Sequence, residues 1–243
     1  MTALHAALKS HYVSYAWLTV ALPASPAVIK KAEQVYPGFW QDLAATVDYM
    51  DVMTYDFHGA FDSPEITNFS APLVADSNQP ATVVGRNTFN VSSAMQAYVD
   101  ANVPTNKLIL GIPSYGRALS QVASNIPAGY TEAPGLYQTF NGAYHGEWDN
   151  TGVYDYREIV EHLLQTGFSH YRIDSVAQSV AYNPTAHAWM SYDGVQDVEK
   201  KCSYVKNQHF AGVMIWSLSG DVRPSATDYQ QKSLVANIAR TLA

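Results

Sequence analysis

Four continuous apolar runs constrain the fold of this chain more than any other feature of its sequence. They cover residues 17–22, 49–55, 107–113 and 210–218. Segments with helical spacing of apolar residues lie between them, for example near 92–102 and 195–207. Runs that are apolar throughout are typical of strands buried on both faces of a parallel sheet, which helices cover. The sequence therefore predicts an α/β fold made of strand–helix units.

The spacing of these runs predicts an insertion. About 30 residues separate the first two runs and about 50 the next two, but about 100 separate the last two, and a structureless connection of that length is uncommon. Short β-prone pieces among Gly, Pro and Asn turns fill this stretch. We therefore predict strand–helix units over 1–117, a small α+β insertion over 118–193, and a final helix, strand and C-terminal helix over 194–243.

Composition excludes several classes of partner and cofactor. The net charge is -7, from 14 Lys and Arg against 21 Asp and Glu, and five basic residues never run together, which argues against nucleic acid. No stretch approaches 18 uninterrupted apolar residues, so no membrane span is predicted. Cys202 is the only cysteine, and the histidines lack a metal-ligand spacing. With no phosphate-binding glycine motif either, we predict neither a metal nor a nucleotide cofactor.

Aromatic residues are numerous and charged residues few. The chain is 12% aromatic, with 17 Tyr and 5 Trp, and only 14% charged, against about a quarter in ordinary soluble domains. This balance suits a protein that binds a neutral ligand with flat apolar faces, such as a sugar. A large hydrophobic core would explain the same composition.

Distinctive polar and aromatic residues follow three of the predicted strands. The segments are VMTYDFHG around Tyr55, GIPSYGR ending at Arg117, and GVMIWSL around Trp216. Because the carboxyl ends of parallel strands meet at one edge of an α/β fold, these side chains are expected to share a site.

These segments resemble three strands of family 18 chitinases: the Met-x-Tyr-Asp strand, the Gly-Ile-Pro-x-Tyr-Gly-Arg strand, and the final strand with its substrate-stacking tryptophan. Their order and the long insertion before the last strand also match. The resemblance implies that the chain is the C-terminal part of a (β/α)8 TIM barrel. It also implies hydrolysis of β-1,4-linked N-acetylglucosamine polymers by a retaining, substrate-assisted mechanism, in a parent protein that is secreted.

The resemblance assigns catalytic roles to two residues. Tyr55 would donate its hydroxyl to the carbonyl oxygen of the substrate's acetamido group, which is the nucleophile in this mechanism. Asp56 would form hydrogen bonds with sugar hydroxyls in the neighbouring subsite. Both residues could instead close a strand-to-loop turn.

Other residues are candidates for substrate binding: Met53, Trp216, Tyr115, Arg117, Phe57 and Trp148. Trp216 would form the floor under the cleaved sugar, because an indole packs against the C–H face of a pyranose. Arg117 would bind either a sugar hydroxyl or an acidic loop residue, and Trp148 stands out as a tryptophan in a polar stretch. Met53 and Trp216 also have an interpretation as core residues. The remaining tryptophans are predicted to be packing residues: Trp17, Trp40 and Trp189.

One expected motif does not occur in the 243 residues. Family 18 enzymes carry a strand Asp-x-x-Asp-x-Asp-x-Glu whose Glu is the general acid, and it belongs immediately before the run 17–22. We therefore expect the N-terminal barrel strands and the catalytic Glu to be absent, and the chain alone to be inactive. The expected partners are chitin oligosaccharides and the missing N-terminal half, with self-association through the exposed sheet.

Two other functions fit the same motifs. One is a chitin-binding or other glycan-binding lectin that has lost its acid, and the other is an endo-β-N-acetylglucosaminidase acting on N-glycans.

Overall fold

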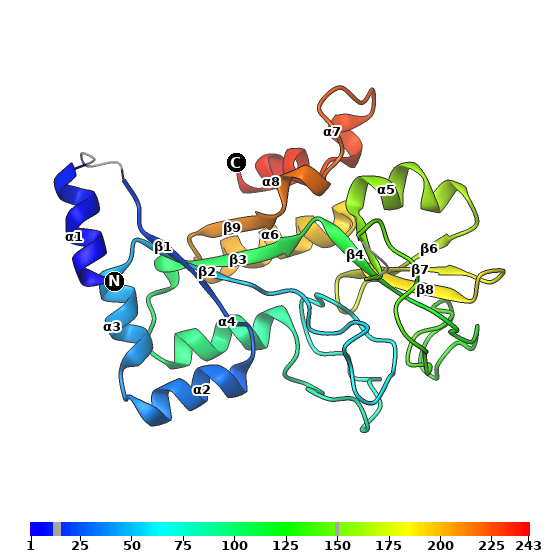
Figure 1. The fold of residues 1–243 in the computed structure, drawn as a ribbon, viewed down its shortest axis with the longest axis horizontal. Coiled ribbons are helices and arrows are strands. Elements are labelled where there is room, and N and C mark those ends of the chain that lie inside the picture. Colours follow the sequence, from blue (N-terminus) through cyan, green and yellow to red (C-terminus); the bar gives the residue numbers. More distant parts are fainter. Residues whose placement is uncertain (12–15, 149–150) are drawn as a thin grey trace.

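The computed structural model describes residues 1–11, 16–148 and 151–243, and its main feature is a pair of sheets (Figure 1). A four-stranded parallel sheet has the order β1-β2-β3-β9, and a five-stranded antiparallel sheet the order β5-β4-β8-β7-β6. The strands are β1 (Thr19–Leu22), β2 (Tyr49–Val52), β3 (Leu108–Pro113), β4 (Tyr115–Leu119), β5 (Val153–Asp155), β6 (Ser169–Ile173), β7 (Gln178–Asn183), β8 (Ala188–Tyr192) and β9 (Gly212–Trp216). The helices are α1 (Thr2–His11), α2 (Pro26–Val35), α3 (Phe39–Thr46), α4 (Val91–Asp100), α5 (Tyr156–Glu161), α6 (Val195–Gln208), α7 (Tyr229–Lys232) and α8 (Leu234–Leu242).

The predicted α/β fold is confirmed, and all four apolar runs form parallel strands. Among the described residues the parallel sheet is open, with β1 and β9 at its edges, and no closed barrel is seen. The strands are shorter than the runs. β2 ends at Val52 because the next residues turn: the Tyr55 N–H donates to the Met53 carbonyl at 2.9 Å, and Asp56 adopts a left-handed φ of 58°.

One face of the parallel sheet carries the core. Met50, Leu110 and Ile112 are fully buried in one cluster with residues from α2, α3, α4 and α6. Trp40 joins this cluster, and its indole N–H donates to the Ile29 carbonyl at 2.9 Å. Burying a large apolar side chain contributes about 1.5–3 kcal/mol, so this layer holds the helices on the sheet.

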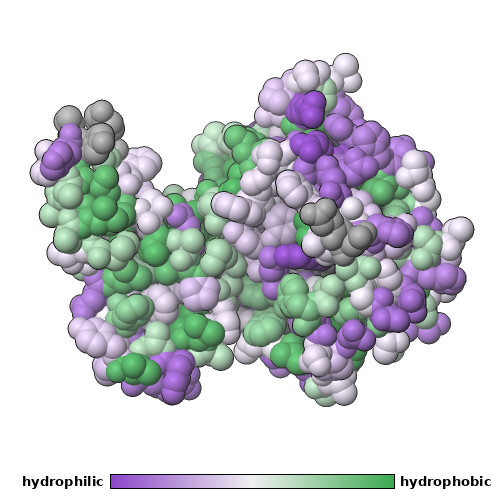
Figure 2. Space-filling model, viewed as in Figure 1, coloured by the Kyte–Doolittle hydropathy of each residue, from purple (hydrophilic) through white to green (hydrophobic). Residues whose placement is uncertain are grey.

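The opposite face of the parallel sheet is only partly buried. Asp51 of β2 pairs with Ile109 of β3, and Met214 of the neighbouring β9 pairs with Gly111. Asp51, Ile109 and Met214 are all partly exposed. Figure 2 shows a notch beside the α1 lobe with hydrophobic residues along its floor. Trp17 was predicted to be a packing residue, and this is wrong: it is 66% exposed and touches Tyr49 edge to face.

The antiparallel sheet follows β3 after a single residue, Ser114. It begins at Tyr115, so the expected boundary between residues 117 and 118 falls inside β4. The division of the chain into units 1–117, 118–193 and 194–243 remains a prediction. The sheet has a second core of its own around Leu119, Val180 and the fully buried Trp189.

A buried ion pair joins the two sheets. The Lys201 ammonium of α6 donates to both carboxylate oxygens of Asp193 at 2.7 and 2.5 Å, and to the Ala71 carbonyl at 2.6 Å. The Gln178 amide donates to Asp193 at 2.9 Å and accepts from the Ala71 N–H at 3.0 Å. Neither charged side chain is exposed. Burial raises the pKa of Asp193, and Lys201 opposes this shift.

No helix in the described part of the chain has both the length and the apolar character needed to span a membrane.

Candidate functional site

Asp56 is the centre of a cluster formed by the loop that follows β2 and the start of β4. Its Oδ1 accepts from the Tyr115 hydroxyl and from Arg117 Nε, both at 2.9 Å, and its Oδ2 accepts from Arg117 Nη2 at 2.7 Å. This two-point pairing holds the carboxylate plane in place. Burial acts to lower the pKa of Arg117, but the hydrogen bonds and charge of Asp56 outweigh it and raise that pKa. Two partners were expected for Arg117, a sugar hydroxyl or an acidic loop residue, and the structure shows the acidic residue, Asp56.

Tyr55 is a hydroxyl donor at neutral pH. Burial, with smaller effects from the carboxylates of Asp56 and Asp51, raises the pKa of Tyr55 to about 12. The ring stands edge-on to that of Tyr115, with 6.2 Å between centroids. A phenol with this pKa keeps its proton and donates hydrogen bonds.

Gly111 leaves room for the Tyr55 ring. A Cβ at this position would lie 2.5 Å from the Val52 carbonyl oxygen and 2.9 Å from Tyr55 Cε1. We expect Gly111→Ala to cost about 1–3 kcal/mol of unfolding free energy, because overpacking displaces the β2 backbone or the ring. Urea unfolding measures this loss. In the control Gly59→Ala, the added Cβ would meet only the far end of the exposed Phe61 side chain, so stability should change little. Unchanged stability of both variants would contradict the prediction.

A cleft of about 390 Å³ opens at the carboxyl ends of β2, β3 and β9. It is lined by Asp56, Ser114, Tyr115, Arg117, Trp148, Val153, Asp155, Trp216 and Ser217. Trp216 is 60% exposed and Trp148 is 53% exposed, so both rings are free to contact a ligand. The Ser114 N–H donates to the Trp216 carbonyl at 2.9 Å, which ties the β3 and β9 loops together.

A second cavity, of about 300 Å³, also has Asp56 in its wall. Its walls are Pro23, Ala24, Ser25, Met53, Tyr55, Asp56, Phe57 and Phe89. Asp56 therefore borders both cavities, and Tyr55 and Met53 line the second.

The fold gathers the sequence-predicted residues on this one edge of the parallel sheet, with one difference. Phe57 is only 6% exposed and packs on Phe89, with ring centroids 6.1 Å apart. It supports the loop and offers a ligand little ring surface, because its position directly after Asp56 turns it towards the core.

Sequence reasoning missed two residues of this region. Phe61 is 59% exposed, and its ring centroid lies 5.6 Å from the Arg117 guanidinium carbon. Asp155 lines the cleft, and burial followed by the nearby Glu147 carboxylate raises its pKa. An aromatic residue two positions after Gly59, in the loop that follows a motif strand, was the available signal for Phe61. Asp155 gave no comparable signal, because its strand, β5, belongs to the antiparallel sheet and not to the motif strands.

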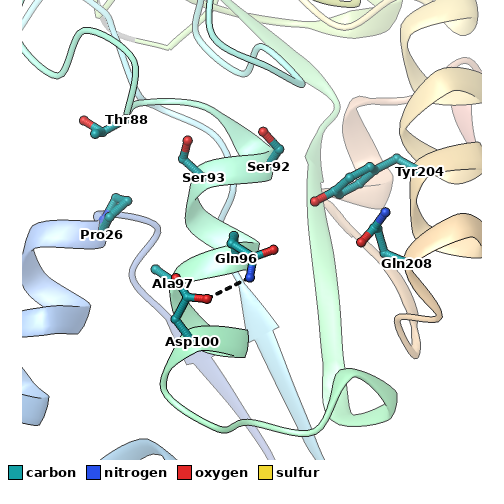
Figure 3. A pocket seen from close by; sticks show the side chains of 9 residues that line it. All are labelled: Pro26, Thr88, Ser92, Ser93, Gln96, Ala97, Asp100, Tyr204 and Gln208. Carbon is teal, nitrogen blue, oxygen red and sulfur yellow. Dashed lines mark hydrogen bonds between the residues drawn. The ribbon is translucent and has the colours of Figure 1, made fainter.

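A larger hollow, of about 520 Å³, lies between α4 and α6 on the outer side of the fold. Figure 3 shows its polar lining, in which Gln96 donates to Asp100 at 2.8 Å while Tyr204 and Gln208 face them from α6. It contains none of the motif residues. Within the described residues no group of three or more His, Cys, Asp or Glu side chains could hold a metal ion.

Comparison with known proteins finds chitinases of similar sequence and similar structure. Chitinase A1 of Niallia circulans is 35% identical over 207 residues, which cover 84% of this chain and 27% of that protein. Chitinase ChiA74 from Bacillus thuringiensis has a similar structure, with a TM-score of 0.77 and 30% identity over 93% of this chain and 35% of that one.

A class V chitinase from Nicotiana tobaccum gives a TM-score of 0.76 at 28% identity, over 100% of this chain and 61% of that one. A mutant of the Nicotiana enzyme was solved in complex with NAG4. The chain thus spans 27% of Chitinase A1 and 61% of the Nicotiana structure, so it corresponds to part of each. The family model described as glycosyl hydrolases family 18 matches residues 1–221, and the chain therefore belongs to that family.

Proposed function

We propose that this chain is the C-terminal part of a (β/α)8 barrel that hydrolyses β-1,4-linked N-acetylglucosamine polymers, with retention and substrate assistance. The observation that carries the proposal is the arrangement of Tyr55, Asp56 and Trp216 at one edge of the parallel sheet, around two adjoining hollows. A neutral polymer with alternating polar edges and apolar faces fits such a site.

In the proposed reaction, the acetamido carbonyl oxygen of the substrate attacks its own anomeric carbon as the glycosidic bond breaks. Tyr55 donates its hydroxyl to that oxygen, which orients the nucleophile and stabilises the charge of the cyclic intermediate. Water then opens the intermediate and restores the original configuration. The raised pKa of Tyr55, about 12, supports this role because the proton stays on the hydroxyl.

The remaining residues bind the sugars. Trp216 carries the sugar that is cleaved, and Met53 fills the wall beside Tyr55. Arg117 and Tyr115 hold Asp56, which binds a sugar hydroxyl in the neighbouring subsite. Trp148 extends the cleft, whereas Phe57 supports it from the core.

The general acid is proposed to come from a segment outside these 243 residues. That segment would also add the other strands of the barrel, edge to edge with β1 and β9 and against the partly exposed face around Asp51, Ile109 and Met214. The match to 61% of the Nicotiana structure supports this proposal. Since chitin is an insoluble polymer that enzymes meet outside the cell, we further propose that the parent protein is secreted.

Binding can be tested on the chain itself, because it does not need the acid. Titration calorimetry with a chitin tetrasaccharide should detect binding to the unmodified chain. We expect Trp216→Ala to weaken it about tenfold or more, since losing a stacked indole removes about 1.5–3 kcal/mol of apolar burial. Trp17→Ala is the matched control, because Trp17 is also an exposed tryptophan but precedes β1, at the opposite end of the strands. Equal effects of the two substitutions would contradict the assignment.

A further inference from the structure

Two exposed tryptophans line the same cleft but come from different parts of the fold. Trp216 ends β9 of the parallel sheet, whereas Trp148 lies in the insertion, just before β5. Their spacing therefore depends on what holds the insertion against the loop after β9.

Asp155 holds the Trp148 side chain. The Trp148 indole N–H donates to Asp155 Oδ1 at 3.3 Å, and the Asp155 side chain is 8% exposed. The Asp155 backbone N–H donates to Glu147 Oε2 at 3.1 Å, which ties the residue before Trp148 to the same strand. Trp148 is thus tied to β5 both through its own indole and through the residue before it.

Arg157 connects this assembly to the loop that carries Trp216. Its Nη2 lies 2.6 Å from Asp155 Oδ2 and 3.4 Å from Glu147 Oε1, and its Nη1 donates to the Ser219 carbonyl. Arg157 therefore pairs with both carboxylates that position Trp148 and also binds the chain three residues after Trp216.

The loop after β9 fits closely against the same group. A Cβ on Gly220 would lie 2.4 Å from the Ser114 carbonyl oxygen and 3.4 Å from Asp155 Oδ1. Only a residue without a side chain allows this approach. This close packing places the loop that follows Trp216 against the Asp155 carboxylate, which positions Trp148.

We propose that Arg157 is a specificity-determining positioning residue that sets the spacing of Trp148 and Trp216, so that the cleft binds one sugar unit beyond the unit stacked on Trp216. The inference rests on the proposed function and deepens it: the ligand class is a longer β-1,4-linked N-acetylglucosamine oligosaccharide. The flat guanidinium suits this role because it binds two carboxylates and a carbonyl at once in fixed directions, which a lysine ammonium on a flexible stem does not do.

The test compares oligosaccharide lengths. Affinities for the chitin disaccharide and tetrasaccharide are measured by calorimetry for the unmodified chain, Arg157→Gln and Arg157→Lys. We expect the tetrasaccharide to lose about tenfold in affinity in both variants and the disaccharide less than about threefold. Arg240→Gln is the control, since Arg240 forms an exposed pair with Glu199 at 2.9 Å, between α6 and α8, and should change neither affinity.

A double-mutant cycle separates positioning from general stability. If Arg157 acts through Trp148, the losses caused by Arg157→Gln and Trp148→Ala should not add. Equal weakening of both oligosaccharides, or additive losses in the cycle, would overturn the inference while leaving the proposed function in place. No binding of either oligosaccharide by the unmodified chain would overturn both.

Discussion

Mixing this chain with a polypeptide that supplies the N-terminal barrel strands and the Asp-x-x-Asp-x-Asp-x-Glu motif should produce chitinase activity that neither piece shows alone. A positioned general acid is worth about 10²- to 10⁴-fold in rate, and the chain by itself offers no such octet. Release of a fluorophore from a chitin oligosaccharide substrate measures the effect. Tyr55→Phe in the mixture should abolish most of the restored rate, because the acetamido oxygen then lacks its donor.

Two controls accompany this experiment. An N-terminal piece with Gln in place of the motif's Glu should associate but not restore activity. In ultracentrifugation, the chain alone should self-associate through its open sheet edges and apolar face, and the N-terminal piece should suppress this. The half-barrel proposal would be contradicted if the chain alone were active, or if it were a monodisperse monomer that does not bind the N-terminal piece.

Lys201→Met should be the most damaging single substitution for stability, with a loss of about 3–5 kcal/mol. Removing one partner of a buried pair leaves the other charge uncompensated, and Lys201 and Asp193 are both fully buried. Total stabilities of about 5–15 kcal/mol make this a large fraction. Urea unfolding measures the loss. The matched control is Lys200→Met, since Lys200 is 49% exposed and lies 3.5 Å from Asp174, and it should change stability little.

The loss in Lys201→Met should depend on pH. Burial already raises the pKa of Asp193 and Lys201 lowers it, so removing Lys201 raises that pKa further. A carboxyl group whose folded-state pKa exceeds its unfolded value, about 3.9, destabilises the fold increasingly as pH rises between the two values. The variant should therefore be closer to the unmodified chain at about pH 5 than at about pH 8. Adding Asp193→Leu should recover much of the loss at both pH values, and a pH-independent loss would contradict this account.

The sequence is sufficient to place the motif residues at one edge of the sheet, because three motif segments follow buried parallel strands; their roles stay a proposal. Because these strands are parallel, Tyr55, Asp56 and Trp216 lie at the same edge of the sheet. The pairing of Arg117 with Asp56 was one of two predicted alternatives, and only the side-chain geometry decides between them.

Other features could not be predicted from residue patterns. Trp17 precedes an apolar strand and was expected to pack, but whether a sheet face is covered depends on elements outside the strand itself. Phe57 was expected among the aromatic residues of the groove, yet the backbone turns at Asp56 and the Phe57 ring packs on Phe89. The contacts of Arg157 link residues 10 and 62 positions away, through irregular loops that carry no periodic signal.

The pairing of Asp56 with Arg117 also fixes which acceptor directions Asp56 would offer to a sugar in the proposed site. Oδ1 accepts two hydrogen bonds from the protein and Oδ2 accepts one, so the open acceptor direction lies on Oδ2. Because the guanidinium holds the carboxylate plane, that remaining lone pair has a fixed direction. In the proposed site, a sugar hydroxyl pointing along this direction would be bound and its epimer would point elsewhere, so Asp56 and Arg117 together would read the stereochemistry of the sugar ring.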